Sequence, residues 1–382
     1  MSINFESKLP KTTTTIFTVM SALAHEHQAV NLSQGFPDYP ADPVLKDLVC
    51  RAIQQDYNQY APMAGVPALL NQISKKIEHS YGWTPDPATE ITIATGASQA
   101  ICSAISMMIS PGDEAIIIEP AYDSYAPAVI MNGGKTRVFE MRAPDFKVDW
   151  QAVRNLINNK TKLLIINNPH NPTGSIFDET DLDEVEKIVQ DTGVYLLSDE
   201  VYEHLVFDGH KHQSILTRPG LKERGMAVFS FGKSLHATGW KIGYLIANPF
   251  LSAEFRKIHQ FTVFSVNSPA QHGIAAYLEG NVDWSKLSGF FQQKRDLLQA
   301  GLQNSRFRPL ISAGTYFQLY DYSNISAQPD YEFAKWLTRE YGVATIPLSP
   351  FYTSDLDQKL VRICFAKKEE TILNAVERLL KV

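Results

Sequence analysis

Two lysines in the segment SFGKSLHATGWKIGY, at positions 230–244, stand between two apolar runs. Lys233 follows the run MAVFSF, and Lys241 opens the run KIGYLIA. An amine at the end of a buried strand loses its proton more readily, because burial or a nearby cation lowers its pKa, and the neutral amine is a nucleophile. Lys241 could supply a point charge to an anion, with the Ser230 hydroxyl as a second donor. The alternative for each lysine is an ordinary exposed position.

A carboxylate and a phenol follow another apolar run. LLSDEVYEHL (196–205) places Asp199 at the end of an expected strand, where an unpaired buried charge would be costly. Tyr202 comes three residues later, so one helical turn would bring both side chains to the same side. The alternative is a helix N-cap at Asp199 with Tyr202 in the core, and the sequence leaves both possibilities open.

The segment TGASQAI (95–101) has the pattern of an anion site. A strand ends, Gly96 turns the chain, and a helix is expected to begin around Ser98. Free backbone N–H groups and the helix dipole favour an anion at such an N-terminus. The alternative is a plain turn with Ser98 near the cap. Neither GxxxxGK[ST] nor GxGxxG is present, so the segment is not one of the two common phosphate-binding motifs.

Two further segments carry polar side chains on stiff backbone. In NNPHNPTG (167–174), Asn171 lies between two prolines, and its alternative role is an amide that bonds its own turn. In LVRICFA (360–366), Val361, Ile363 and Phe365 would face one side of a strand and Arg362 the other. An arginine in so apolar a strand suits a bidentate grip on a carboxylate, whereas the alternative is a solvated sheet face.

The expected elements bring these residues together. From about residue 45 to about 250, short runs rich in Ile, Val and Leu alternate with helical patterns. Strands that are apolar throughout are typical of a parallel sheet with helices on both faces, which indicates an α/β domain. Ligands bind at the carboxyl ends of such strands. The residues expected to meet there are Gly96, Tyr122, Asn171, Asp199 and Lys233, after strands at 91–95, 114–120, 162–168, 194–199 and 227–231, with helices at 98–109 and 178–192.

The last hundred residues predict a smaller α+β unit. Strand patterns at 314–322, 343–348 and 360–366 alternate with helical patterns at 330–342 and 368–382. An amphipathic helix expected at 15–30 would pack with this unit. The predicted organisation is therefore an N-terminal helix and loop at 1–44, a large domain at 45–285 and a small domain at 286–382.

The composition narrows the class of protein. The 382 residues include 44% hydrophobic and 20% charged residues, as in ordinary globular proteins. A net charge of -6 gives no case for a nucleic-acid partner. Three scattered cysteines, no Cys/His cluster, no signal peptide and no apolar run of membrane length predict a reduced, cytoplasmic protein without a metal or membrane partner.

The motifs occur together in an order that is far more specific than any one of them. NPHNPTG, SDEVYEH, SFGKSLHATGWKIGY and VRICFA resemble the class I/II aminotransferases, enzymes of fold type I that use pyridoxal 5'-phosphate. The likeness runs from NLSQGFPDYP to VRICFAKKEE. GFPDYP, NQYAPMAG and the pair Gly232-Lys233 point to the kynurenine, glutamine and methionine aminotransferase branch, and most closely to its bacterial methionine enzymes.

The resemblance implies roles around the cofactor ring. Lys233 matches the lysine that bonds to the cofactor and moves the proton. Asp199 matches the carboxylate paired with the pyridine nitrogen. Tyr202 and Asn171 match contacts of the ring hydroxyl, and Tyr122, in EPAYDSY, matches the aromatic residue stacked on the ring. The implied phosphate contacts are Gly96, Ala97, Ser98, Ser230 and Lys241.

Other implied roles concern the substrate and a partner subunit. Arg362 and the backbone at Gly35 match the grip on the substrate α-carboxylate, to which Asn171 also contributes. Phe17 is expected to line an apolar side-chain pocket. Tyr60, in NQYAP, matches a tyrosine that reaches the phosphate of the neighbouring subunit, which implies a homodimer with shared active sites.

The sequence departs from the commonest class pattern at Gly232, where serine is frequent, and at Lys241, where arginine is usual. A lysine neutralises phosphate without forming the planar fork. Both variants suit the kynurenine/glutamine branch. The predicted activity is amino transfer from a methionine, glutamine or aromatic L-amino acid to a 2-oxo acid in two half-reactions. The alternatives are cysteine-conjugate β-lyase activity and a non-catalytic binding module, against which the retained Lys233 argues.

Overall fold

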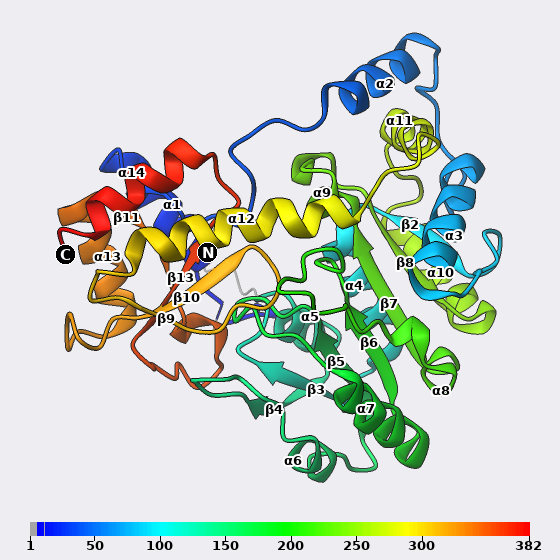
Figure 1. The fold of residues 1–382 in the computed structure, drawn as a ribbon. Helices are drawn as coiled ribbons and strands as arrows, with labels where there is room; N and C mark the ends of the chain where they lie inside the picture. Colours follow the sequence, from blue (N-terminus) through cyan, green and yellow to red (C-terminus); the bar gives the residue numbers. More distant parts are fainter. Residues whose placement is uncertain (1–5, 11) are drawn as a thin grey trace, which may run out of the picture.

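The computed structural model describes residues 6–10 and 12–382, so residues 1–5 and Lys11 of the predicted N-terminal unit lie outside the described residues. Its larger sheet has seven strands (Figure 1). In spatial order they are β2 (Ile91–Ala94), β8 (Gly243–Ala247), β7 (Gly225–Ser230), β6 (Tyr195–Asp199), β5 (Thr161–Asn167), β3 (Glu114–Glu119) and β4 (Lys135–Glu140).

The predicted α/β fold with a mostly parallel sheet is confirmed. Strand β8 alone runs antiparallel to its neighbours β2 and β7. Strand β7 ends at Ser230 and β8 begins at Gly243, so residues 231–242 connect these two antiparallel neighbours. That connection holds both Lys233 and Lys241.

Both faces of the large sheet are covered. In β7, Met226 and Val228 pack with α4 and α10, whereas Ala227 and Phe229 point to the opposite core. This alternation explains why the strands are apolar at every position. The helices of this part of the chain are α2 (Pro43–Gln54), which packs on α11, and α3 (Pro67–Tyr81), α4 (Gly96–Met108), α5 (Tyr125–Met131), α6 (Trp150–Asn155), α7 (Glu179–Thr192), α8 (Pro219–Lys222), α9 (Phe231–Ser234), α10 (Pro249–Thr262) and α11 (Ser268–Leu278), with 3-10 turns at Ile215–Thr217 and Thr238–Trp240.

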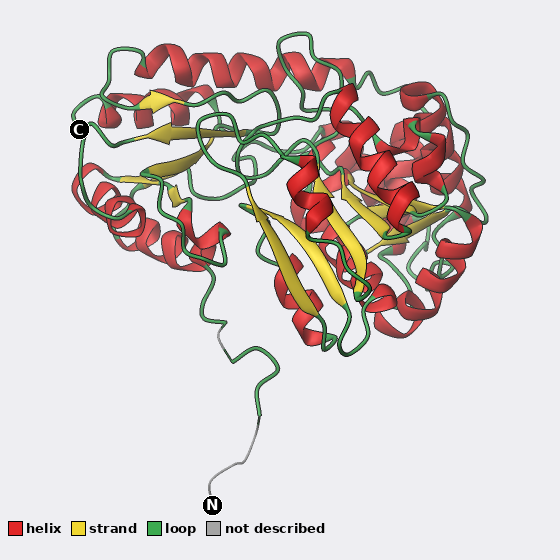
Figure 2. Cartoon of the chain, turned by 90° about the horizontal axis from the view of Figure 1, so that it is seen from below, coloured by secondary structure: helices red, strands yellow, loops and turns green. Residues whose placement is uncertain are grey.

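A second, four-stranded sheet lies on the other side of the molecule, as Figure 2 shows from below. Its order is β12 (Ile346–Pro347), β13 (Leu360–Cys364), β10 (Phe317–Asp321) and β9 (Arg308–Pro309), all antiparallel. Strand β1 (Val30–Asn31) pairs with β11 (Val343–Ala344), and α1 (Ile16–Glu26) packs on α13 and β11. The remaining helices are α12 (Ser285–Leu302), α13 (Asp330–Tyr341), α14 (Glu369–Leu379) and the 3-10 turn Ser349–Phe351.

Two local expectations need correction. Helix α4 begins at Gly96, two residues before the expected start, because Gly96 adopts φ 74° and turns the chain directly into the helix. After Asp199 the chain forms turns in place of the expected helical turn or N-cap. The Val201 N–H donates to Asp199 Oδ1 at 3.3 Å, and this side-chain bond to the backbone favours a turn. The predicted domain boundaries stay predictions.

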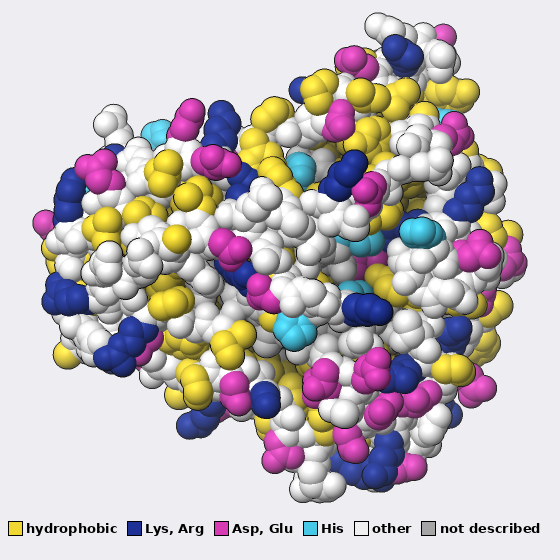
Figure 3. Space-filling model, in the orientation of Figure 1, with side chains coloured by type: hydrophobic (Ala, Val, Ile, Leu, Met, Phe, Trp, Pro, Cys, Tyr) yellow, Lys and Arg dark blue, Asp and Glu magenta, His cyan; other side chains and the backbone are white. Residues whose placement is uncertain are grey.

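The surface carries no block of one charge on the face shown in Figure 3, where acidic and basic side chains are interspersed. Across the described residues, no helix is both long enough and apolar enough to cross a bilayer.

Candidate active site

A cavity of about 320 Å³ lies where the carboxyl ends of the large sheet face β10 and β13 of the small one. Parallel pairing aligns Asn167 with Asp199 and Asp199 with Val228, so the ends of β5, β6 and β7 stand side by side. Every predicted site residue except Tyr60 lines this cavity: Phe17, Gly35, Gly96, Ala97, Ser98, Tyr122, Asn171, Asp199, Tyr202, Ser230, Lys233, Lys241 and Arg362.

Lys233 occupies the last turn of the short helix α9. Its Nζ lies 2.9 Å from the Tyr316 hydroxyl and 3.3 Å from the Gly35 carbonyl oxygen. Burial lowers the pKa of the Lys233 amine to about 8, and the nearby cations Lys241 and Arg362 act in the same direction. The lower pKa makes the neutral, nucleophilic form of this amine more accessible near neutral pH than it is for an exposed lysine.

Gly232, directly before Lys233, lies in a backbone segment with little room for a side chain. A Cβ at Gly232 would lie 3.1 Å from Thr238 Cα and 3.3 Å from Ser230 Oγ. Such contacts are tighter than those of ordinary side chains, so this backbone suits glycine where serine is common in the class.

Asp199 is a buried acid at the end of β6. Its Oδ2 accepts a hydrogen bond from the Tyr125 hydroxyl at 2.6 Å, and its own carbonyl accepts one from Asn167 Nδ2 at 2.8 Å. Burial raises the pKa of Asp199 to about 6, although the hydrogen bond from Tyr125 opposes the rise. A cationic ring nitrogen placed against this carboxylate would lower that pKa again.

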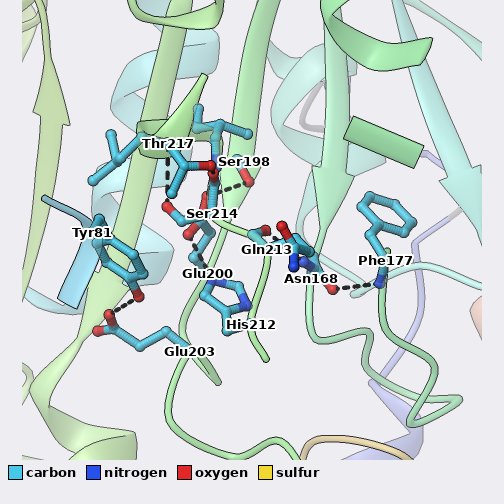
Figure 4. Close-up of polar contacts among 12 residues, drawn as sticks. Tyr81, Asn168, Phe177, Ser198, Glu200, Glu203, His212, Gln213, Ser214 and Thr217 are labelled. Carbon is cyan, nitrogen blue, oxygen red and sulfur yellow. Dashed lines mark hydrogen bonds and ion pairs between the residues drawn. The ribbon is translucent and has the colours of Figure 1, made fainter. Parts of the chain in front are cut away.

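A second set of buried charges anchors the turn that follows Asp199, and Figure 4 shows one of its pairs, Glu200 with His212. Glu200 accepts from His212 Nε2 at 2.8 Å, and Glu203 accepts from Lys76 Nζ at 2.7 Å. Both carboxylates and Lys76 are buried. Because removing one member of a buried pair leaves a charge without a partner, these contacts hold the turn in one conformation.

The N-terminus of α4 forms a donor set at one end of the cavity. No side chain caps this helix, so its first N–H groups stay available. A Cβ at Gly96 would lie 3.1 Å from Lys241 Nζ, which shows how closely the ammonium approaches the helix start. Ser98 and Ser230 also line this end. Backbone N–H groups and two serine hydroxyls beside one lysine charge fit the phosphate of the cofactor that the sequence implies.

The opposite end of the cavity is built around Arg362, which is only 1% exposed. Its Nη1 donates to Asn171 Oδ1 at 2.7 Å and its Nη2 to the Ser33 carbonyl at 3.0 Å. The guanidinium carbon lies 3.8 Å from the Phe317 ring centroid and 5.3 Å from that of Phe17. The alternative of an arginine on a solvated sheet face is therefore wrong, and burial lowers the pKa of Arg362 to about 10.

Tyr60 lies outside the cavity. It is 81% exposed, and its ring meets that of Phe264 edge to face with centroids 5.1 Å apart. Its expected contact with a neighbouring subunit stays a prediction.

Sequence reasoning missed three residues that touch the predicted ones. Tyr125 and Asn167 hold Asp199, and Tyr316 holds Lys233. Tyr125 comes three residues after Tyr122, a spacing that puts both on one side of a helical turn, so a signal existed. Tyr316 stood in a segment expected to be a strand, where no pattern identifies which tyrosine faces a ligand.

The chain resembles known proteins over nearly its whole length. Residues 27–379 match the family model for aminotransferase class I and II. Methionine aminotransferase of Escherichia coli (strain K12) is 47% identical over 375 residues, which cover 98% of this chain and 97% of that protein. The kynurenine--oxoglutarate transaminase of Dictyostelium discoideum is 33% identical, with 96% of this chain and 94% of that protein covered.

Solved structures agree with the sequence comparison. An Escherichia coli crystal structure described as identifying a methionine aminotransferase function superposes with a TM-score of 0.97, at 46% identity and with 100% of both chains covered.

Proposed function

Because this chain belongs to the class I and II aminotransferases and is a transaminase that depends on pyridoxal phosphate, we propose that its amino donors are methionine, glutamine or aromatic L-amino acids. The acceptor is a 2-oxo acid. The observation that supports this proposal is that Lys233, Asp199 and Arg362, the single arginine of the cavity lining, lie in one cavity whose wall is partly apolar.

The residues of the cavity would have separate roles in the reaction. When bound, pyridoxal phosphate supplies an electron-accepting ring and a carbonyl carbon that bonds to amines. Asp199 would keep a proton on the ring nitrogen, and Tyr202 and Asn171 would bond the ring hydroxyl. Arg362 and the Gly35 backbone would hold the substrate α-carboxylate. The Lys233 amine would then remove and return the α-proton as base and acid.

The side-chain specificity follows from the lining near Arg362. Phe17, Phe36, Ile101, Ile242 and Phe317 contribute apolar surface to the cavity, and the ring centroids of Phe17 and Phe317 lie 5.3 and 3.8 Å from the Arg362 guanidinium carbon. Among the described residues that line the cavity, Arg362 is the only arginine, so a second carboxylate would find no guanidinium partner in this chain. Apolar or uncharged donors therefore suit the wall better than dicarboxylates. The likeness to enzymes named for methionine and kynurenine supports the same choice.

The test is a single-turnover titration of the holoenzyme with L-methionine, L-glutamine, L-phenylalanine and L-aspartate. We expect the visible cofactor band to convert fastest with one of the first three, with release of the matching 2-oxo acid. Preference for L-aspartate would contradict the proposed donor class. Release of pyruvate and ammonia from a cysteine conjugate without an acceptor acid would instead indicate the β-lyase alternative.

The proposal includes a cytoplasmic homodimer. Phe261, Phe264 and Tyr60 are exposed to 87%, 54% and 81%, an apolar group that a second subunit would cover. In such a dimer Tyr60 would reach the phosphate of the partner's cofactor. Sedimentation velocity of the full chain tests this: a monomer at micromolar concentration would contradict it, and so would unchanged cofactor affinity in Tyr60→Ala.

A further inference from the structure

Tyr316 makes the closest side-chain contact of the reactive amine. Its hydroxyl lies 2.9 Å from Lys233 Nζ and donates its own proton to the Gly35 carbonyl oxygen. The same carbonyl oxygen lies 3.3 Å from Lys233 Nζ. Because the single Tyr316 proton goes to Gly35, the hydroxyl oxygen is left to accept a hydrogen bond from the amine.

The two hydrogen-bond acceptors of the Lys233 amine define the direction of its lone pair. A neutral Lys233 amine has two N–H bonds and one lone pair. If Tyr316 Oη and the Gly35 oxygen each accept one N–H, the lone pair is the position left over, and Lys233 lines the cavity in which the substrate would lie. A general base acts only when its lone pair is aligned with the proton that it abstracts.

The Gly35 carbonyl is held in place by contacts of the residues on both sides of it. Lys367, only 3% exposed, donates to the Phe36 carbonyl at 2.7 Å and to the Gln34 carbonyl at 3.4 Å, on either side of Gly35. A Cβ at Gly35 would lie 2.8 Å from Phe317 Cζ, so this loop is seated directly on β10.

The Tyr316 ring is equally confined. It is completely buried and meets the Tyr202 ring edge to face with centroids 5.0 Å apart. Burial raises the pKa of the Tyr316 phenol well above its ordinary value, with Tyr202 acting in the same direction, so the hydroxyl stays protonated at every working pH. It can therefore keep donating to Gly35 while it accepts from Lys233.

We propose that Tyr316 is a further catalytic residue of this transaminase, which with the Gly35 carbonyl holds the released Lys233 amine so that its lone pair faces the substrate α-proton. In the step concerned, the lone pair forms an N–H bond as the Cα–H bond breaks, and the electron pair of that bond stays with the substrate. The loop that would grip the α-carboxylate thereby also orients the base. The inference rests on the transaminase chemistry, not on the preferred donor.

The kinetic test compares Tyr316→Phe with Tyr320→Phe in the holoenzyme. Tyr320 lies four residues further along, is completely buried, and has a hydroxyl without a hydrogen-bond partner among the described residues. With L-methionine we expect Tyr316→Phe to lower kcat by about 10- to 100-fold with little change in KM, because the base loses alignment. The Cα-deuterium isotope effect should rise. Tyr320→Phe should match the wild type in both.

A second readout does not depend on turnover. The rate at which acetic anhydride modifies Lys233 in the cofactor-free chain, followed against pH by peptide mass spectrometry, reports the pKa of the amine. An ammonium donates more strongly than an amine, so loss of the Tyr316 acceptor should lower that pKa below the wild-type value. Tyr320→Phe should leave it unchanged.

Three outcomes would overturn the inference. These are wild-type kcat in Tyr316→Phe, a slow variant whose loss lies in KM without a larger isotope effect, and a modification profile identical to that of the wild type. If the wild type itself fails to convert L-methionine, the proposed donor fails instead, and the comparison is run with L-glutamine.

Discussion

The cavity has two regions suited to anions, and they are built in opposite ways. At the phosphate end, the first turn of α4 and the exposed Lys241 offer several donors around one charge. At the carboxylate end, the buried Arg362 lies against Phe317 and is tied to Asn171 and Ser33. The first region suits a permanently bound dianion, because several weak donors together bind its negative charge. The second suits an exchanging substrate, because one preorganised fork selects a carboxylate by its geometry.

This difference predicts how each region responds to the loss of one side chain. A group of donors tolerates the loss of one member, whereas a single desolvated guanidinium does not. Burial also makes the charge of Arg362 costly to leave without a partner, while water screens Lys241.

Lys233→Ala should remove the amine that lies between the two regions and leave both anion-binding regions intact. We expect turnover to fall by about 10⁴-fold, the upper range for loss of a general acid–base. Cofactor should still bind, since its phosphate donors lie elsewhere, but without the visible band of the covalent form. Absorbance spectra and equilibrium dialysis measure the two effects. A persistent band with normal turnover would contradict the role of Lys233.

Arg362→Ala should abolish the carboxylate region while sparing the phosphate region. We expect kcat/KM to fall by about 2–5 kcal/mol in transition-state free energy, as for loss of one partner of a desolvated pair. Arg362→Lys should recover little, because an ammonium cannot replace the planar fork. Cofactor affinity is the control and should not change. Unchanged steady-state kinetics in either variant would remove Arg362 from the site.

Lys241→Met should weaken the phosphate region only modestly. We expect cofactor affinity to fall by about 1 kcal/mol, with a smaller difference at high salt, since an exposed charge is screened. Lys241→Arg should bind cofactor as the wild type does. Equilibrium dialysis at two salt concentrations measures this. A loss as large as that of Arg362→Ala in its own assay would contradict the contrast between the two regions.

Asp199→Asn tests the buried charge that lies between the regions. The folded-state pKa of Asp199 is raised from 3.8 to about 6, so between these pH values the folded chain holds more protons than the unfolded chain. The free energy of unfolding of the cofactor-free wild type should therefore fall as pH rises through this window. In the variant this contribution is absent, so its stability relative to the wild type should increase with pH. Urea unfolding at pH 4 and pH 6.5 measures the difference, and parallel curves would contradict the assignment.

The strand ends were predictable because their pattern is local. Apolar runs followed by Gly96, Asp199 or Lys233 can be recognised without knowledge of any distant residue, and the parallel sheet then brings them together. The direction of β8 was not predicted, because strand composition is the same in either orientation. The conformation after Asp199 was also missed, since it is held by side-chain contacts, among them the bond from Val201 N–H to Asp199 and the distant partners of Glu200 and Glu203.

By itself, the sequence determined the family, the α/β class, the cofactor and most of the cavity lining, because these depend on motifs whose residues are near neighbours along the chain. Only the tertiary structure decided that Tyr316 holds Lys233, that Tyr125 holds Asp199, and that Arg362 is buried. Lys233 and Tyr316 lie 83 positions apart in the chain. No local preference encodes such a contact. It arises because the fold brings Tyr316, the residue directly before β10, against the strand end that carries Lys233.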